Sequence, residues 1–214
     1  MIEIIPVLNV KTFPKLQKHL SLLKKYKGLL QLDVADGKFT TWKNFHDIAK
    51  IKLLKIKNPI EIHLMINDPE TYIQDWLFLK PKRIITHIEA IKDFNFLYNT
   101  TKKAGVELGL AISPETSTKQ LYPYINKTSF VLILGVVPGP SGQEFETYVL
   151  NKIKELKRKY PKVKIEADGG INLENAKTIC SAGADYLAVG SYIFDAPKPL
   201  EALELLKQSL QTQC

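Results

Sequence analysis

The chain contains little cysteine: Cys180 and Cys214 are the two among 214 residues. They are not closely spaced, so the sequence predicts neither a disulfide framework nor a zinc knuckle, and both thiols are expected to be reduced. No segment is long and apolar enough to cross a bilayer, and the start, MIEIIPVLNV, lacks the features of a signal peptide. These absences predict a cytoplasmic protein that has no membrane partner.

Arginine is also scarce, because Arg83 and Arg158 are the only two and lysine supplies most of the positive charge behind the net charge of +8. The lysines are scattered over amphipathic segments such as KLQKHLSLLKKYK and LNKIKELKRKYPK. This pattern favours solvated helix faces over nucleic-acid binding, since base recognition usually needs arginine and interleaved aromatic side chains. We therefore expect no nucleic-acid partner, whereas the positive field favours anionic small molecules such as sugar phosphates.

Low-complexity tracts and linkers are absent from a chain that is 45% hydrophobic and 24% charged. The segment PGPSG, residues 138–142, is predicted to be a long loop and not a domain boundary. Residues 1–214 are therefore predicted to form one domain with a substantial core.

Short apolar runs alternate with helical patterns along the chain, which predicts an α/β fold. Strands are expected at Glu3–Leu8, Leu29–Val34, Ile60–Ile66, Arg83–Glu89, Glu107–Ser113, Phe130–Val136, Lys164–Ala167 and Tyr186–Gly190. Helices are expected at Pro14–Tyr26, Thr41–Lys50, Pro69–Leu77, Lys92–Ala104, Ser117–Tyr122, Glu144–Tyr160, Leu173–Ala182 and Pro199–Leu210. This alternation favours a closed (β/α)8 TIM barrel. An open doubly wound sheet is the main alternative, although VLNVKTF after the first strand lacks its glycine fingerprint.

Three of the predicted strands carry ionisable residues. QLDVADG places Asp33 on the same face as Gln31, IEIHLMI places His63 within an apolar run, and KIEADGG places Asp168 before two glycines. A buried charge usually needs a partner, a metal or a catalytic task. The three strands therefore predict a polar site built at strand ends, although a lone histidine in an apolar strand is more often a hydrogen-bonded core residue.

Several other polar residues have structural interpretations. Asp68 before Pro69 is predicted to cap a helix, and Asp36 is predicted to organise the loop after the second strand. His19 and His46 fall on predicted helices and are expected to lie at the surface.

Seven motifs in order along the chain resemble those of the ribulose-phosphate 3-epimerase family: QLDVADGKF, IEIHLMINDPETYI, RIITHIEA, GLAISPET, VVPGPSGQEF, EADGGIN and AVGSYIF. DVxDGxF, HLM and DGGI in this order are fairly specific, whereas AVGS occurs in many phosphate-binding barrels. Orotidine-phosphate decarboxylase and hexulose-phosphate synthase look less similar, because LDVADG has no lysine between its aspartates. The resemblance implies a (β/α)8 barrel with isomerase activity.

The resemblance also implies which residues act. The family interconverts D-ribulose 5-phosphate and D-xylulose 5-phosphate through an enediolate, and its two catalytic aspartates match Asp33 and Asp168. His63 matches a family metal ligand and is also expected to bind the substrate. Asp33, His63 and Asp168 are therefore expected to hold a divalent metal of the zinc, iron, manganese or cobalt type. His87 and Glu89 also resemble a family pattern, but a structural hydrogen-bonding role is at least equally expected for them.

The expected phosphate site lies after the last three strands, where glycines let backbone N–H groups approach a dianion. The residues expected to bind the substrate phosphate there are Gly142, Gly169, Gly170, Gly190 and Ser191.

Departures from the family pattern cluster around the expected catalytic residues, away from the expected phosphate site. Gln31 replaces a metal-binding histidine, so weaker metal binding is expected. Of the family's methionines this chain keeps Met65, whereas Ala35 and Leu134 occupy the other two positions, and Asn9 stands where a serine is usual.

These departures leave two functions open. The first is phosphoketose 3-epimerisation. The second is a diverged barrel that binds a sugar phosphate without epimerising it or acts on another phosphosugar. A homo-oligomer is compatible with the sequence, but nothing in it indicates the oligomeric state.

Overall fold

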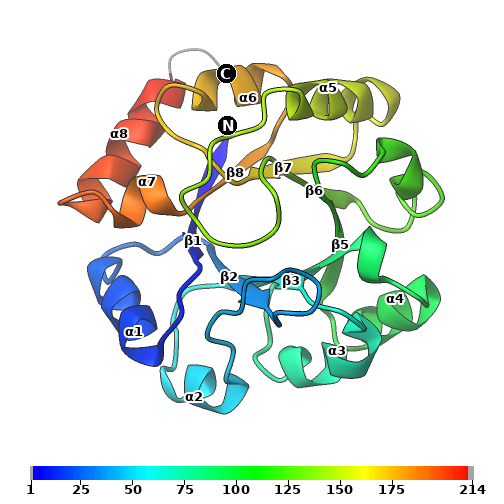
Figure 1. Cartoon of the computed structure of the whole chain (residues 1–214), viewed down its shortest axis with the longest axis horizontal. Coiled ribbons are helices and arrows are strands. Elements are labelled where there is room, and N and C mark those ends of the chain that lie inside the picture. Colours follow the sequence, from blue (N-terminus) through cyan, green and yellow to red (C-terminus); the bar gives the residue numbers. More distant parts are fainter. Residues whose placement is uncertain (1, 212–214) are drawn as a thin grey trace.

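Eight parallel strands close into a barrel in the computed structural model, which describes residues 2–211 (Figure 1). Each strand pairs with the next, and β8 pairs with β1. The strands are β1 Glu3–Leu8, β2 Leu30–Ala35, β3 Ile60–Met65, β4 Arg83–His87, β5 Glu107–Ile112, β6 Phe130–Leu134, β7 Lys164–Asp168 and β8 Tyr186–Val189. The closed order confirms the predicted (β/α)8 fold and excludes the open sheet.

Helices ring the barrel in Figure 1. They are α1 Phe13–Leu22, α2 Ile48–Leu53, α3 Pro69–Leu77, α4 Phe94–Lys103, α5 Val149–Lys159, α6 Ala176–Ser181, α7 Ser191–Phe194 and α8 Pro199–Gln211, with 3₁₀ turns η1 Ile88–Ala90 and η2 Thr118–Leu121. None of those in the described part of the chain is long and apolar enough to cross a membrane.

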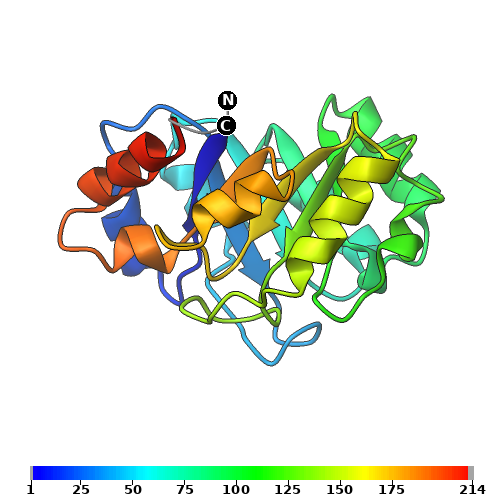
Figure 2. The same ribbon diagram turned by 90° about the horizontal axis from the view of Figure 1, so that it is seen from above.

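Strand alternation separates the core from the barrel interior. On β3, Ile62 and Leu64 join the large apolar cluster shared with the helices, whereas the residues between and beside them point inward. Figure 2 shows the barrel from the side, with the long loops after β2 and β6 at the same lower edge. These loops therefore lie over the carboxyl ends of the strands, where TIM barrels carry their active sites.

The helix predicted at 41–50 is largely wrong, because α2 begins at Ile48 behind the N-cap Asp47. The preceding segment is held as a loop instead. The Asn44 side chain bonds to the Asp33 carbonyl and the Ala35 N–H of β2, and His46 lies in the same loop. Sequence periodicity also missed the four-residue α7.

Two smaller predictions were wrong and one is confirmed. His19 is 8% exposed, because its ring stacks on Phe194 with centroids 4.1 Å apart. Asp68 adopts a left-handed backbone with φ 52° and makes no side-chain capping bond; it pairs with Lys92 instead. Asp36 does organise its loop, since its carboxylate accepts bonds from the N–H groups of residues 38, 39 and 67. Cys214 lies outside the described residues.

Candidate active site

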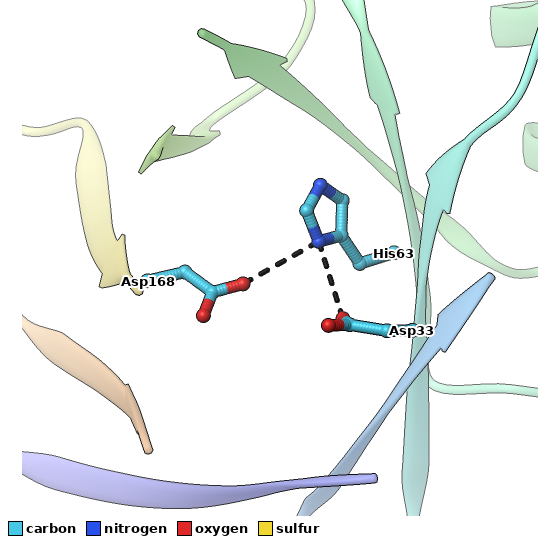
Figure 3. Close-up of side chains that lie close together, drawn as sticks. All are labelled: Asp33, His63 and Asp168. Carbon is cyan, nitrogen blue, oxygen red and sulfur yellow. Dashed lines mark hydrogen bonds and ion pairs between the residues drawn. The ribbon is translucent and has the colours of Figure 1, made fainter. Parts of the chain in front are cut away.

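The three ionisable strand residues meet inside the mouth of the barrel. His63 Nδ1 of β3 lies 3.3 Å from Asp33 Oδ1 of β2 and 3.4 Å from Asp168 Oδ2 of β7. Figure 3 shows the two aspartates reaching toward the same ring nitrogen from different strands. All three side chains are buried. Their short separations agree with the sequence prediction that they form one cluster.

Burial and charge act in opposite directions on this cluster. Burial alone would lower the pKa of His63, but the hydrogen bonds and charges of Asp168 and Asp33 raise it to about 9. Burial raises the pKa of Asp168 above its usual range, and the neighbouring Asp33 charge adds to the effect. The two carboxyl groups therefore favour the protonated form of the His63 ring, whereas their own negative charges repel each other.

The same three side chains fit a divalent metal. Each offers one ligand atom, and these atoms lie within 4.8 Å of one another. Two ligands of a tetrahedral ion at about 2.1 Å are roughly 3.4 Å apart. Because the observed nitrogen-to-oxygen separations are 3.3 and 3.4 Å, Asp33, His63 and Asp168 can hold such an ion once Nδ1 is deprotonated.

From the sequence, Gln31 of β2 was expected only to weaken metal binding. Its Nε2 group donates to Asp33 Oδ1 at 2.9 Å and to Asp168 Oδ2 at 2.7 Å. The side chain is fully buried. An uncharged donor thus bridges the two carboxylates, a role that the sequence alone did not indicate.

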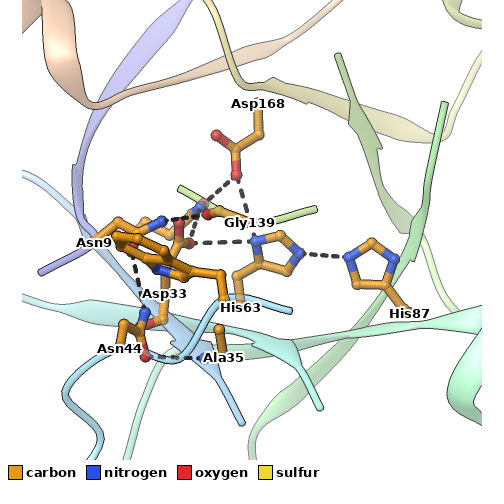
Figure 4. A network of polar contacts seen from close by, with 10 residues as sticks. Asn9, Asp33, Ala35, Asn44, His63, His87, Gly139 and Asp168 are labelled. Atoms are coloured by element: carbon orange, nitrogen blue, oxygen red, sulfur yellow. Dashed lines mark hydrogen bonds and ion pairs between the residues drawn. The ribbon is translucent and has the colours of Figure 1, made fainter. Parts of the chain in front are cut away.

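A chain of hydrogen bonds extends from His63 to the next strand (Figure 4). His63 Nε2 lies 2.9 Å from His87 Nε2, and His87 Nδ1 lies 3.2 Å from Glu89 Oε2. Burial opposes ionisation of Glu89, but its bonds to His87, Thr116 and Ser113 bring its pKa down to about 2. Burial lowers the pKa of His87, which favours the neutral ring.

These contacts determine the tautomer of His87 and, when His63 is neutral, that of His63 as well. The Glu89 carboxylate only accepts, so His87 must carry its proton on Nδ1 and accept at Nε2. His63 must then donate from Nε2, which leaves its Nδ1 to face the aspartates. From the sequence alone the roles of His87 and Glu89 stay open, and in the structure both residues lie behind a candidate metal ligand.

Asparagine side chains hold the end of β2 and the loops above it. Asn44 Nδ2 donates to the Asp33 carbonyl at 2.8 Å and to Asn9 Oδ1 at 3.2 Å. Asn9 Nδ2 in turn donates to the Gly139 carbonyl at 3.1 Å (Figure 4). Thr40 Oγ1 adds a bond of 2.6 Å to the Pro138 carbonyl. The loops after β1, β2 and β6 are therefore joined across the mouth.

One cavity contains all of the predicted site residues. It is lined by the triad and by every residue expected to bind phosphate, namely Gly142, Gly169, Gly170, Gly190 and Ser191. Its volume is about 40 Å³. Small-molecule sites usually measure about 300–1,000 Å³, so this cavity is small for a ligand of that class while the loops are joined.

Gly170 shows why one part of the cavity wall needs glycine. Its φ is +67°, and an added Cβ would lie 2.4 Å from the backbone nitrogen of Phe145. Any other residue would force the loop after β7 away from the loop after β6. Glycine here is therefore required by the close approach of two loops that line the cavity.

A second buried polar cluster lies deeper in the barrel and was missed by the sequence analysis. Arg83 Nη1 donates to Glu61 Oε2 at 3.0 Å and lies 3.9 Å from Glu166 Oε2. Both glutamates are fully buried. Each shares a strand face with a site residue two positions away, so the alternation that located His63 and Asp168 also carried the signal for this cluster.

Comparisons with known proteins agree along nearly the whole chain. The profile of a family described as "Ribulose-phosphate 3 epimerase family" matches residues 3–194. The ribulose-phosphate 3-epimerase of Schizosaccharomyces pombe is 29% identical over 216 residues, which cover 97% of this chain and 93% of that protein. That of Bacillus subtilis is 28% identical and covers 98% and 100%. The cytoplasmic isoform from Oryza sativa is 30% identical and covers 85% and 82%.

Solved structures of other enzymes share the fold. A 3-hexulose-6-phosphate synthase from Salmonella typhimurium superposes with a TM-score of 0.73 at 14% identity, covering 98% of each chain. An orotidine 5'-monophosphate decarboxylase from Sulfolobus solfataricus has a TM-score of 0.69 at 16% identity and covers 99% and 98%. At these identities the similarity extends to the barrel alone.

Proposed function

Because the chain belongs to the ribulose-phosphate 3-epimerase family, we propose that it interconverts D-ribulose 5-phosphate and D-xylulose 5-phosphate. The main supporting observation is the convergence of Asp33 and Asp168, from β2 and β7, on the cavity that the candidate phosphate residues also line. Two acid–base groups and a phosphate site in one cavity are what this reaction needs.

Inversion at C3 requires that a proton leave one face of the carbon and that another arrive on the opposite face. One aspartate, as the carboxylate, takes the C3 proton, and the electron pair moves into an enediolate. The other aspartate, as the carboxylic acid, delivers its proton to the opposite face. Burial raises the pKa of Asp168 and so favours its protonated form, which suits an acid in one direction and a base in the other.

Asp33, His63 and Asp168 would hold the divalent metal, of the zinc, iron, manganese or cobalt type. When bound, such an ion supplies positive charge that stabilises the developing enediolate. Met65 and Leu134 line the same cavity and give it apolar surface. We assign the backbone around Gly170, Gly190 and Ser191 to the substrate phosphate, because these residues line the same cavity.

Proton exchange tests the proposal. The metal-supplemented protein is incubated with D-ribulose 5-phosphate in deuterated water, and NMR follows deuterium at C3 and the formation of D-xylulose 5-phosphate. Exchange accompanied by epimerisation is the expected result. Folded protein that shows neither signal with several divalent metals would contradict it.

A diverged sugar-phosphate binder is the second candidate, and Gln31 favours it. Its amide bridges both aspartates, so neither carboxylate is free of a buried donor. The same experiment separates the candidates, because a binder would retain phosphate-dependent affinity for the sugar while C3 keeps its proton.

A further inference from the structure

The Gln31 carboxamide contacts the same two oxygens that flank His63 Nδ1. Its nitrogen lies 2.9 Å from Asp33 Oδ1 and 2.7 Å from Asp168 Oδ2. A carboxamide nitrogen carries two protons, one for each of these bonds. The amide therefore satisfies one oxygen of each carboxylate at the point where a metal held by these residues would also act.

The two ends of a carboxamide have nearly the same shape and opposite polarity. Two carboxyl oxygens lie in front of the amide as acceptors, so the NH₂ end faces them. The oxygen then points away, and within residues 2–211 no donor reaches Gln31 Oε1, although the atom is buried. A buried acceptor without a partner is rare and marks a strained or functional arrangement.

A divalent cation reverses this preference. A positive ion between Asp33, His63 and Asp168 would repel the NH₂ end and attract the oxygen. Rotation by half a turn about the terminal side-chain bond exchanges the two ends and leaves the backbone of β2 in place. The orphaned oxygen would then have a partner.

We propose that the Gln31 carboxamide is a reversible substitute for the metal. Its N–H groups hold Asp33 and Asp168 in the metal-free protein, and its oxygen turns toward a divalent cation when one binds. The carboxylate pair thus keeps its arrangement in both states. This inference rests on the proposed function for the identity of the site, but its test requires no turnover.

NMR of the Gln31 side-chain amide tests the proposal directly. Its ¹⁵N–¹H signals are assigned by their loss in Gln31→Met, and zinc is the diamagnetic probe. In the metal-free protein both protons should exchange with solvent at least 100-fold more slowly than those of the exposed Gln17. Zinc should shift the amide nitrogen and the Cδ carbon together with the His63 ring. Zinc binding that leaves the Gln31 signals in place, rapid exchange in the metal-free protein, or failure of zinc to bind would each overturn the proposal.

Gln31→Glu tests the two ends of the carboxamide separately, because it keeps the shape of the side chain and its oxygen but loses both N–H groups. At pH 8 in EDTA the variant should melt at a lower temperature than the wild type. Zinc should raise its melting temperature by more than it raises that of the wild type, with at least tenfold tighter binding by calorimetry. Gln17→Glu, at an exposed site of α1, is the matched control and should behave like the wild type. Equal melting temperatures of Gln31→Glu and the wild type in EDTA would contradict the proposed role of the N–H groups.

Discussion

Asp33 and Asp168 reach the cavity from different strands, so each is expected to serve one face of the substrate. Replacing either by asparagine should lower kcat for epimerisation by at least about 100-fold, the usual contribution of a general acid or base. Each variant should still exchange the C3 proton of one epimer, and the two variants should prefer opposite epimers. NMR in deuterated water, started separately from D-ribulose and D-xylulose 5-phosphate, measures this. Identical exchange patterns in the two variants would contradict the two-face assignment.

Glu89 is expected to act on the site through His87, because its carboxylate holds the proton on His87 Nδ1 and so sets the tautomer of the neutral His63 ring. In Glu89→Gln this constraint is lost, and zinc affinity should fall by roughly 10- to 100-fold, as for other residues that orient metal-binding histidines. Calorimetry measures the affinity, and ¹⁵N NMR reports the tautomers of both rings. Glu115→Gln is the nearby control, since Glu115 is exposed and bonds to Tyr148. An unchanged tautomer would assign Glu89 a purely structural role.

The loop after β6 lines the small cavity, and the Thr40 Oγ1 bond to the Pro138 carbonyl is one of the contacts that join it to the loop after β2. Thr40→Val keeps the shape of the side chain and removes this bond. Because one hydrogen bond is worth about 0.5–1.5 kcal/mol, amide exchange in residues 137–143 should quicken by roughly 2- to 10-fold. Hydrogen–deuterium exchange with mass spectrometry measures the rates. Thr147→Val makes the same replacement at an exposed residue farther along this connection and should leave the rates unchanged.

The strands of this barrel were predictable because their signals are local. Nearly continuous apolar runs gave boundaries within a residue or two, and α3 matched Pro69–Leu77. The helix predicted at 41–50 was wrong because the conformation of this segment depends on the bonds of Asn44 to β2. A helical periodicity in the sequence does not reveal such bonds. His19 was misjudged for the same reason, since its partner Phe194 is remote in sequence.

The sequence could predict which residues form the candidate site, but not the hydrogen bonds among them. Motif order and strand alternation indicated Asp33, His63 and Asp168, which do meet. The direction of the Gln31 amide depends on atoms from β2 and β7 together, so only the folded barrel reveals it. The functional roles of these residues, the single domain over residues 1–214 and the cytoplasmic location stay predictions.

At the scale of the whole molecule, the buried cluster below the site should make stability fall with rising pH. Burial raises the pKa of Glu61 to about 7, although Arg83 opposes the shift. Burial, with the charge of Glu61, raises the pKa of Glu166 well above its usual range. Both folded-state pKa values exceed the unfolded one, so their stabilising contribution is complete below about pH 4.3 and is lost as the pH rises.

Glu166→Gln removes one of these protonation differences. In the wild type, the folded Glu166 keeps a proton that the unfolded chain loses above about pH 4.3, and each such proton costs about 1.4 kcal/mol of stability per pH unit. Above about pH 5.5, the slope of the unfolding free energy should therefore become less negative in the variant by up to about this amount, as measured by urea unfolding. Glu201→Gln, on the exposed face of α8, controls for the loss of one negative charge. If the two variants have the same slope, Glu166 is ionised in the folded barrel, and a neighbouring cation must offset its charge.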